Sequence, residues 1–220
     1  MFPPLLRSRG LYAITDGPRP DLLAAAQSAL EGGATLLQYR DKTDDRQRRL
    51  EEATALSKLC ARFCLPLIVN DDVELARASS AAGVHLGERD VSIAQARAML
   101  GDEAIIGASC YDSLQRARDA AIEGADYLAF GAFFPSPTKP NARRAALDLL
   151  RQARALGKPL VAIGGITADN GSLLIEAGAD FLAVISGVFG ASDVRNATSR
   201  FAALFEDRKT LDSRSRGNDD

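Results

Sequence analysis

One pattern repeats along almost the whole sequence: a short apolar run followed by a longer amphipathic segment, a pair that occurs eight times. The runs are rich in Val, Ile, Leu and Ala and are often bounded by Gly or Pro, which is typical of buried parallel strands. We therefore predict strands at residues 11–15, 36–40, 66–70, 83–87, 105–109, 127–131, 159–164 and 181–186.

The segments between these runs have helical spacing. In residues 145–156, Leu149, Leu150, Ala153 and Leu156 recur at steps of three and four, so they share one face of a helix. Several such segments end in glycine, which tolerates the left-handed conformation that closes a helix. The pattern thus predicts strand and helix in alternation.

Eight such units predict fold class α/β and a single (β/α)8 TIM barrel. A doubly wound open sheet is the alternative, because a weak strand is easily miscounted. We predict that residues 1–205 form this catalytic domain and that residues 206–220, which are polar and unpatterned, form a disordered tail.

Composition limits the classes of partner. The net charge of −2 creates no field that favours nucleic acid or a membrane surface, and no stretch approaches the roughly 20 apolar residues of a membrane span. Cys60, Cys64 and Cys110 suggest ordinary thiols rather than a disulfide framework, which favours a reducing cytoplasm. We expect a cytoplasmic protein with small-molecule partners; a homo-oligomer stays open.

Polar side chains follow most of the predicted strands at the point where each strand ends. The active sites of such barrels form at the carboxyl ends of the strands, where these side chains meet. The residues concerned are Gln38, Arg40, Asp41, Lys42, Asn70, Asp71, Asp90, Ser109, Lys139, Gly164, Gly165 and Ser186.

Asp71 and Asp90 follow neighbouring strands, so their carboxylates can converge. Two carboxylates and the oxygens of a diphosphate make a plausible Mg²⁺ site. The alternative for each residue is helix capping, since Asp71 or Asp72 precedes a helix beginning near residue 72, and Asp90 precedes one beginning near Ser92. Only their joint placement favours the metal.

Three cations point to a phosphorylated substrate. Arg40 and Lys42 leave the same strand two residues apart, and Lys139 lies in a loop that three prolines restrict. Departure of a diphosphate requires neutralisation of negative charge, which such cations and Mg²⁺ supply.

The segments AIGGI at 162–166 and SGVFG at 186–190 end the last two predicted strands. Loops at these places often bind phosphate through backbone N–H groups, although glycines also serve tight turns. His85, the only histidine, lies inside a strand, where a packed, hydrogen-bonded core residue is favoured over a catalytic base.

The ordered set of motifs resembles the thiamine phosphate synthase family over about residues 11–205. The motifs are LYAITD at 11–16, LLQYRDK at 36–42, LIVNDD at 67–72, GVHLGERD at 83–90, IIGASC at 105–110, GADYLAFGAFFPSPTKP at 124–140, VAIGGI at 161–166 and AVISGVF at 183–189. The resemblance implies a transferase that joins hydroxymethylpyrimidine diphosphate to thiazole phosphate, with Mg²⁺ and loss of pyrophosphate.

The resemblance also implies roles for individual residues. Ser109, Lys139 and Arg40 are implied to be catalytic, and Asp71 and Asp90 to bind Mg²⁺. The residues implied to hold the pyrimidine diphosphate are Gln38, Tyr39, Arg40, Asp41, Lys42, Asn70, Ser109 and Lys139. Those implied to hold the thiazole phosphate are Ser136, Pro137, Thr138, Gly165, Ile185 and Ser186.

Two positions depart from the family pattern, which often has Gln where this chain has Glu88 and Thr-His or similar where it has Cys110 and Tyr111. Cys110 has no histidine close in sequence, which argues against a nucleophile. Two other functions stay open: a thiazole tautomerase, which resembles the synthase but uses a histidine after the fifth strand, and a non-enzymatic regulator that binds a phosphometabolite.

Overall fold

The computed structural model describes residues 9–135 and 144–215, with side chains described as far as residue 206. Eight parallel strands form a closed barrel in sequence order, and β1 pairs with β8 to complete the ring. The strands are β1 (Gly10–Ile14), β2 (Ala34–Tyr39), β3 (Leu67–Asn70), β4 (Gly83–Leu86), β5 (Ile105–Tyr111), β6 (Tyr127–Phe130), β7 (Leu160–Ile163) and β8 (Phe181–Val184). The barrel prediction is confirmed, and closure rules out the open sheet.

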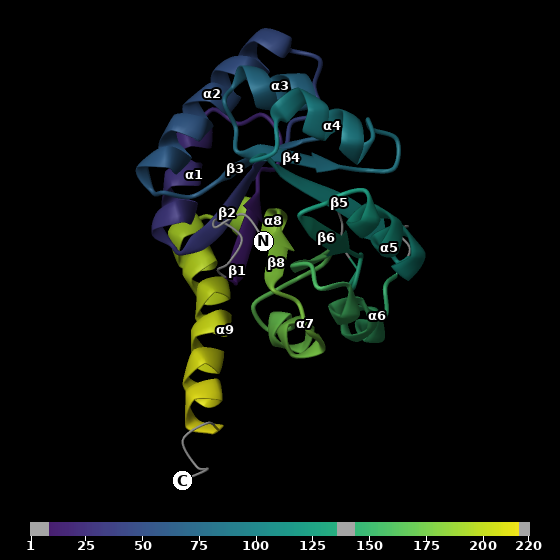
Figure 1. The fold of residues 1–220 in the computed structure, drawn as a ribbon. Helices are drawn as coiled ribbons and strands as arrows, with labels where there is room; N and C mark the ends of the chain where they lie inside the picture. Colours follow the sequence, from purple (N-terminus) through teal and green to yellow (C-terminus); the bar gives the residue numbers. More distant parts are fainter. Residues whose placement is uncertain (1–8, 136–143, 216–220) are drawn as a thin grey trace.

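Helices surround this ring, as Figure 1 shows. They are α1 (Leu22–Glu31), α2 (Arg46–Arg62), α3 (Val73–Ala78), α4 (Ile93–Leu100), α5 (Leu114–Ile122), α6 (Leu147–Ala153), the 3-10 helix η2 (Arg154–Leu156), α7 (Gly171–Ala177), α8 (Ser186–Phe189) and α9 (Val194–Ser215). The predicted helix at 145–156 corresponds to α6 and η2 together. None of the helices within the described ranges has the length and apolar content needed to cross a membrane.

Alternation along each strand divides the buried residues into two sets. One set contains strand residues only and fills the inside of the barrel, for example Tyr12, Leu36, Ile68, Tyr127 and Phe181. The other set joins the outward faces of the strands to the helices, as Leu37 and Tyr39 do on β2. Side-chain direction at the end of a strand therefore follows from its position in this alternation.

Helix α9 packs against α1 and β1 beside the closure of the ring. In Figure 1 its last turns extend away from the barrel. The helical backbone continues to Ser215, beyond the predicted domain boundary at residue 205, while residues 216–220 lie outside the described part. The predicted tail at 206–220 stays a prediction.

Candidate active site

The carboxyl ends of the eight strands bring most of the predicted residues to one rim. Gln38 lies near the end of β2, Asn70 ends β3, Ser109 lies near the end of β5, and Gly165 and Ile185 follow β7 and β8. The connections that leave the same ends contain Arg40, Lys42, Asp71 and Asp90, and Ser186 begins helix α8 after β8. Ser136, Pro137, Thr138 and Lys139 lie outside the described residues.

The segment 38–42 alternates between two environments. Gln38 is buried inside the barrel, where it hydrogen-bonds Tyr12, whereas Tyr39 belongs to the outer core. Asp41 continues the outward direction, and its side chain is 0% exposed in an ion pair with Arg48 of α2. Lys42 is exposed and ion-pairs with Asp71 across the rim. The segment thus directs Gln38 and Lys42 towards the mouth while Tyr39 and Asp41 face the helices.

The two helix starts beside the carboxylates are capped by other residues. Asp72 accepts the hydrogen bond from Leu75 N that begins α3, and Ser92 forms a capping box with Gln95 at the start of α4. Neither Asp71 nor Asp90 therefore caps the helix that follows it, which was the alternative role for both residues. Asp90 instead accepts from Gly87 N at 2.7 Å, within the loop after β4.

The Asp71 carboxylate lies close enough to Asp90 to affect the ionisation of Asp90. Burial raises the pKa of Asp90; the Gly87 N–H opposes this, and the neighbouring Asp71 carboxylate raises the pKa further. Two carboxylates that meet at a partly buried rim repel each other unless a cation lies between or beside them. Lys42 supplies part of that compensation through its pair with Asp71.

These two carboxylates fit a magnesium ion of the kind that substrate phosphates help to bind. Among the described residues no group of three or more His, Cys, Asp and Glu side chains could hold a metal. Mg²⁺ commonly takes only one or two carboxylates together with water and substrate phosphates, so a pair of oxygen ligands beside a site for an anionic substrate suits it.

A chain of hydrogen bonds crosses the inside of the barrel between two predicted substrate-binding residues. Gln38 Nε2 donates to the Tyr12 hydroxyl at 2.7 Å, which lies 2.9 Å from the Tyr127 hydroxyl. Tyr127 contacts His85 Nδ1 at 2.9 Å, and His85 Nε2 lies 2.9 Å from Ser109 Oγ. The side-chain positions of Gln38 and Ser109 are therefore linked through three interior residues.

Close packing makes this chain possible. A Cβ at Gly107 would overlap the ring of Tyr127, so only glycine leaves room for that tyrosine beside β5. The His85 and Tyr127 rings stack with centroids 5.5 Å apart. Burial lowers the pKa of His85 to about 4, so the imidazole is neutral near pH 7. The prediction of a hydrogen-bonded interior histidine is confirmed.

The ends of β6 and β7 lie together. Phe134 N donates to Gly164 O at 3.0 Å, and a Cβ at Gly165 would overlap the carbonyl oxygens of Phe134 and Pro135. The glycine at 165, with φ +66, thus lets the chain that leads into residue 136 lie directly against the rim. Ile185 precedes α8, and Ser186 is its exposed first residue.

A hollow of about 470 Å³ opens beside the rim, between the segments that follow β2 and β3. Lys42, Asn70 and Asp71 line it, together with Arg49 and Met99. Asp41 also lines the hollow, so four of the predicted site residues share it.

The two departures from the family pattern have structural explanations. Glu88 ion-pairs with Arg116 of α5 at 3.1 Å and does not join the Asp71–Asp90 pair. Cys110 is buried, and burial raises the pKa of its thiol to about 12, which keeps it protonated and a poor nucleophile.

Sequence reasoning missed Tyr12, Tyr127 and Arg48. The two tyrosines lie in apolar strands and look like ordinary core, and only the burial of a hydroxyl, which needs a partner, could have indicated more. Arg48 had a clearer signal, because Glu52 follows it by four residues on a predicted helix.

The fold and the rim together define an enzyme of the (β/α)8-barrel class, with its site at the carboxyl ends of the strands. The sequence profile of the family described as thiamine monophosphate synthase matches residues 11–188. The chain belongs to the thiamine monophosphate synthase family.

Individual relatives agree with this assignment. The thiamine-phosphate synthases of Acidithiobacillus ferrooxidans and Azoarcus sp. are 54% and 56% identical, covering 91% and 90% of this chain and 95% and 98% of their own lengths. A solved structure, the thiamine phosphate pyrophosphorylase from Pyrococcus furiosus, is 38% identical with a TM-score of 0.84, covering 92% of this chain and 98% of that one. The homologues are transferases of thiamine biosynthesis.

Proposed function

We propose that this chain makes thiamine phosphate by joining hydroxymethylpyrimidine diphosphate to thiazole phosphate with release of pyrophosphate. The observation that carries the proposal is the juxtaposition of Asp71, Asp90 and Lys42 at one rim, where a diphosphate and a divalent cation would compensate each other's charge. Membership of the family supports the same reaction.

The reaction divides into two steps. The C–O bond to the diphosphate breaks and its electron pair leaves with pyrophosphate, which gives a cation stabilised by the pyrimidine. The thiazole nitrogen then donates its lone pair to form the C–N bond. No protein nucleophile is needed, which agrees with a protonated Cys110 and a neutral His85.

The proposed roles divide the rim between the two substrates. Gln38, Asn70 and Ser109 bind the pyrimidine diphosphate by hydrogen bonds, and Arg40, Lys42 and Lys139 stabilise the charge that develops on pyrophosphate. Ser136, Pro137, Thr138, Gly165, Ile185 and Ser186 hold the thiazole phosphate. Gly165 supports this division because its lack of a side chain lets the segment before Ser136 reach the rim.

Asp71 and Asp90 would hold Mg²⁺ in this proposal. The ion, when bound with the substrate, would neutralise charge on the departing diphosphate. The two carboxylates contribute the charge that attracts the cation, and Lys42, now paired with Asp71, is the side chain that would turn to the diphosphate. We also propose a cytoplasmic location, which the free thiols Cys60, Cys64 and Cys110 support.

Incubation of the purified protein with both phosphorylated substrates and Mg²⁺ tests the proposal. We expect thiamine phosphate and pyrophosphate in equal amounts, and none after chelation of the metal. Isomerisation of the thiazole alone would indicate a tautomerase, and protection against thermal unfolding without turnover would indicate a regulator. Either result would contradict the proposed function.

A further inference from the structure

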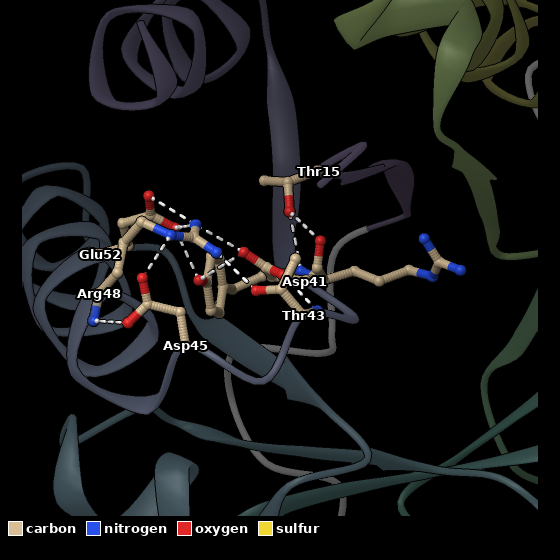
Figure 2. Close-up of polar contacts among 8 residues, drawn as sticks. Thr15, Asp41, Thr43, Asp45, Arg48 and Glu52 are labelled. Atoms are coloured by element: carbon tan, nitrogen blue, oxygen red, sulfur yellow. Dashed lines mark hydrogen bonds and ion pairs between the residues drawn. The ribbon is translucent and has the colours of Figure 1, made fainter. Parts of the chain in front are cut away.

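Arg48, on the first turn of α2, contacts Asp41, Thr43 and Asp45 in the segment that follows β2, and it also contacts Glu52 within its own helix. Its Nη1 lies 2.7 Å from Asp41 Oδ2, and its Nη2 donates to Thr43 Oγ1 at 2.6 Å. Nη1 also lies 3.0 Å from Glu52 Oε1, one turn further along the helix. Figure 2 shows Arg48 between Asp41, Thr43 and Glu52.

Asp41 uses both of its carboxylate oxygens in this arrangement. Oδ2 pairs with Arg48, and Oδ1 accepts from Thr43 N at 2.8 Å, while the side chain is 0% exposed. Burial alone would raise the pKa of Asp41, but the hydrogen bonds from Arg48 and Thr43 outweigh it and hold the pKa below its usual value. A buried carboxylate of this kind depends on its cation, because an unpaired buried charge is strongly unfavourable.

Tyr39 connects the strand to the same group of residues. Its hydroxyl donates to Glu52 Oε2 at 2.7 Å, and since it has one proton, the 3.5 Å approach to Asp41 is secondary. Burial and this bond to Glu52 raise the pKa of Tyr39. We call Tyr39, Asp41, Thr43, Arg48 and Glu52 the Arg48 cluster.

The Arg48 cluster fixes the residues on either side of Arg40 and Lys42. Tyr39 and Asp41 face the helix, so the intervening Arg40 and the following Lys42 occupy the positions that alternate towards the mouth. On the barrel side, Thr15 Oγ1 accepts from Arg40 N at 2.8 Å and donates to Arg40 O at 3.1 Å. The main chain at Arg40 and Asp41 is therefore held by Thr15 on one side and, through Asp41, by Arg48 and Thr43 on the other.

We propose that Arg48 is a positioning residue: through Asp41 and Thr43 it holds Arg40 and Lys42 in the arrangement that binds a diphosphate. Tyr39 and Asp41 then contribute through the Arg48 cluster rather than through side-chain contact with the substrate. This inference rests on the proposed function of Arg40 and Lys42 at the diphosphate.

Two readouts on Arg48→Met test the proposal: affinity for inorganic pyrophosphate with Mg²⁺ by calorimetry, and steady-state kinetics. We expect pyrophosphate affinity to fall, and KM for the pyrimidine diphosphate to rise, about tenfold or more, with KM for the thiazole phosphate within about twofold. Arg48→Lys keeps the charge but cannot reach three oxygens in one plane, so we expect an intermediate loss. Wild-type pyrophosphate affinity in Arg48→Met would overturn the proposal.

Arg97→Met is a matched control. Arg97 of α4 lies 2.7 Å from Asp126 Oδ2, which also accepts from Ile106 N, so it is another partly buried arginine paired with an aspartate that accepts a backbone N–H. This pair lies at the amino ends of β5 and β6, opposite the mouth. We expect Arg97→Met to lower Tm without changing pyrophosphate affinity. If Arg97→Met lowered pyrophosphate affinity as much as Arg48→Met does, the effect would be general structural damage, and the proposal would be overturned.

A double-mutant comparison identifies the route of the effect. In an Arg40→Ala/Lys42→Ala background, at low ionic strength to keep weak binding measurable, Arg48→Met should change pyrophosphate affinity by less than about twofold. If Arg48→Met lowered pyrophosphate affinity by the same factor in that background as in the wild type, positioning through the two cations would be overturned. Absence of thiamine phosphate synthesis by the wild type would contradict the proposed function instead, because pyrophosphate binding still reports on Arg48.

Discussion

Asp72 caps helix α3, and its neighbour Asp71 ion-pairs with Lys42 at the mouth of the barrel. The two successive aspartates therefore contact different partners. Asp71 has a left-handed backbone, with φ 64, and Asp72 has an extended one, with φ −98. A capping aspartate stabilises its helix, whereas one at the rim is available to a cation.

This division predicts different consequences for the same substitution. Asn caps a helix about as well as Asp, so Asp72→Asn should leave the fold intact. The Mg²⁺ concentration for half-maximal turnover should stay within about twofold of wild type. Asp71→Asn should raise the Mg²⁺ concentration for half-maximal turnover about tenfold or more, because it removes the negative charge of a proposed ligand. Initial rates across a Mg²⁺ titration measure both.

Asp90→Asn should behave like Asp71→Asn, and Ser92→Ala serves as its control. Ser92 caps α4, so its loss should cost about 1 kcal/mol of stability without altering Mg²⁺ dependence. Wild-type Mg²⁺ dependence in Asp71→Asn or Asp90→Asn would remove that residue from the proposed metal site.

Tyr127→Phe should interrupt the hydrogen-bond chain that links Gln38 to Ser109. The change removes the hydroxyl that joins Tyr12 to His85 and leaves both without this partner, which should destabilise the fold by about 1–3 kcal/mol. We expect kcat/KM for the pyrimidine diphosphate to fall about tenfold, since misplaced binding groups lose alignment. Thermal unfolding and steady-state kinetics check the two effects.

Ser79→Ala supplies the comparison for that variant. Ser79 is a buried residue whose hydroxyl donates to Leu75 O in the last turn of α3, and Leu75 O also accepts from Ser79 N. We expect a small loss of stability and unchanged kinetics. If Tyr127→Phe also kept its full kcat/KM, the interior hydrogen-bond chain would stabilise the fold without aligning Gln38 and Ser109 for the substrate.

The barrel could be predicted from sequence because its signal is local. Each apolar run reports the burial of one strand, and parallel strands place their carboxyl ends together once the ring closes. The rim positions of Gln38, Asn70 and Ser109 follow from that rule without knowledge of any contact. The strand limits differ by a residue or two, as at β2, which begins at Ala34.

The interior contacts could not be predicted because they join residues far apart in sequence. Tyr12 and Tyr127 are 115 residues apart, and nothing near either one indicates the other. The choice between Asp71 and Asp72 as the cap also stayed open, since it depends on a backbone angle at Asp71 that no local pattern specifies. Contacts between distant residues decide both, since Asp71 N donates to His85 O of the neighbouring strand β4.

Lys139→Ala follows from the sequence alone, because the residue lies outside the described part. If Lys139 stabilises the departing pyrophosphate, the chemical step should slow about 10²-fold, the scale of losing one charge-stabilising group. Single-turnover kinetics measure that step directly. Lys58→Ala, at an exposed position on α2, should leave it unchanged; equal rates in the two variants would reject the role of Lys139.

Gly165→Ala tests whether the close approach of the chain at Phe134 and Pro135 serves the thiazole phosphate. Alanine at φ +66 is strained, and its Cβ would overlap two backbone oxygens, so the segment leading to Ser136 must move. Gly157→Ala is the matched control, with φ +64 and nothing within 4 Å of the added carbon. In both variants the strain of alanine in a left-handed backbone should lower the free energy of unfolding by about 1 kcal/mol.

Only Gly165→Ala should lose a further amount of unfolding free energy, about 1–3 kcal/mol, because of the overlap. It should also raise KM for the thiazole phosphate about tenfold and leave KM for the pyrimidine diphosphate unchanged. The reason is that the displaced backbone leads into the residues proposed to hold that phosphate, whereas Gly157 lies at the end of η2, before β7 begins. Thermal unfolding and kinetics with each substrate varied in turn measure these effects. Equal KM values for the thiazole phosphate in the two variants would show that the contact at Gly165 serves folding only.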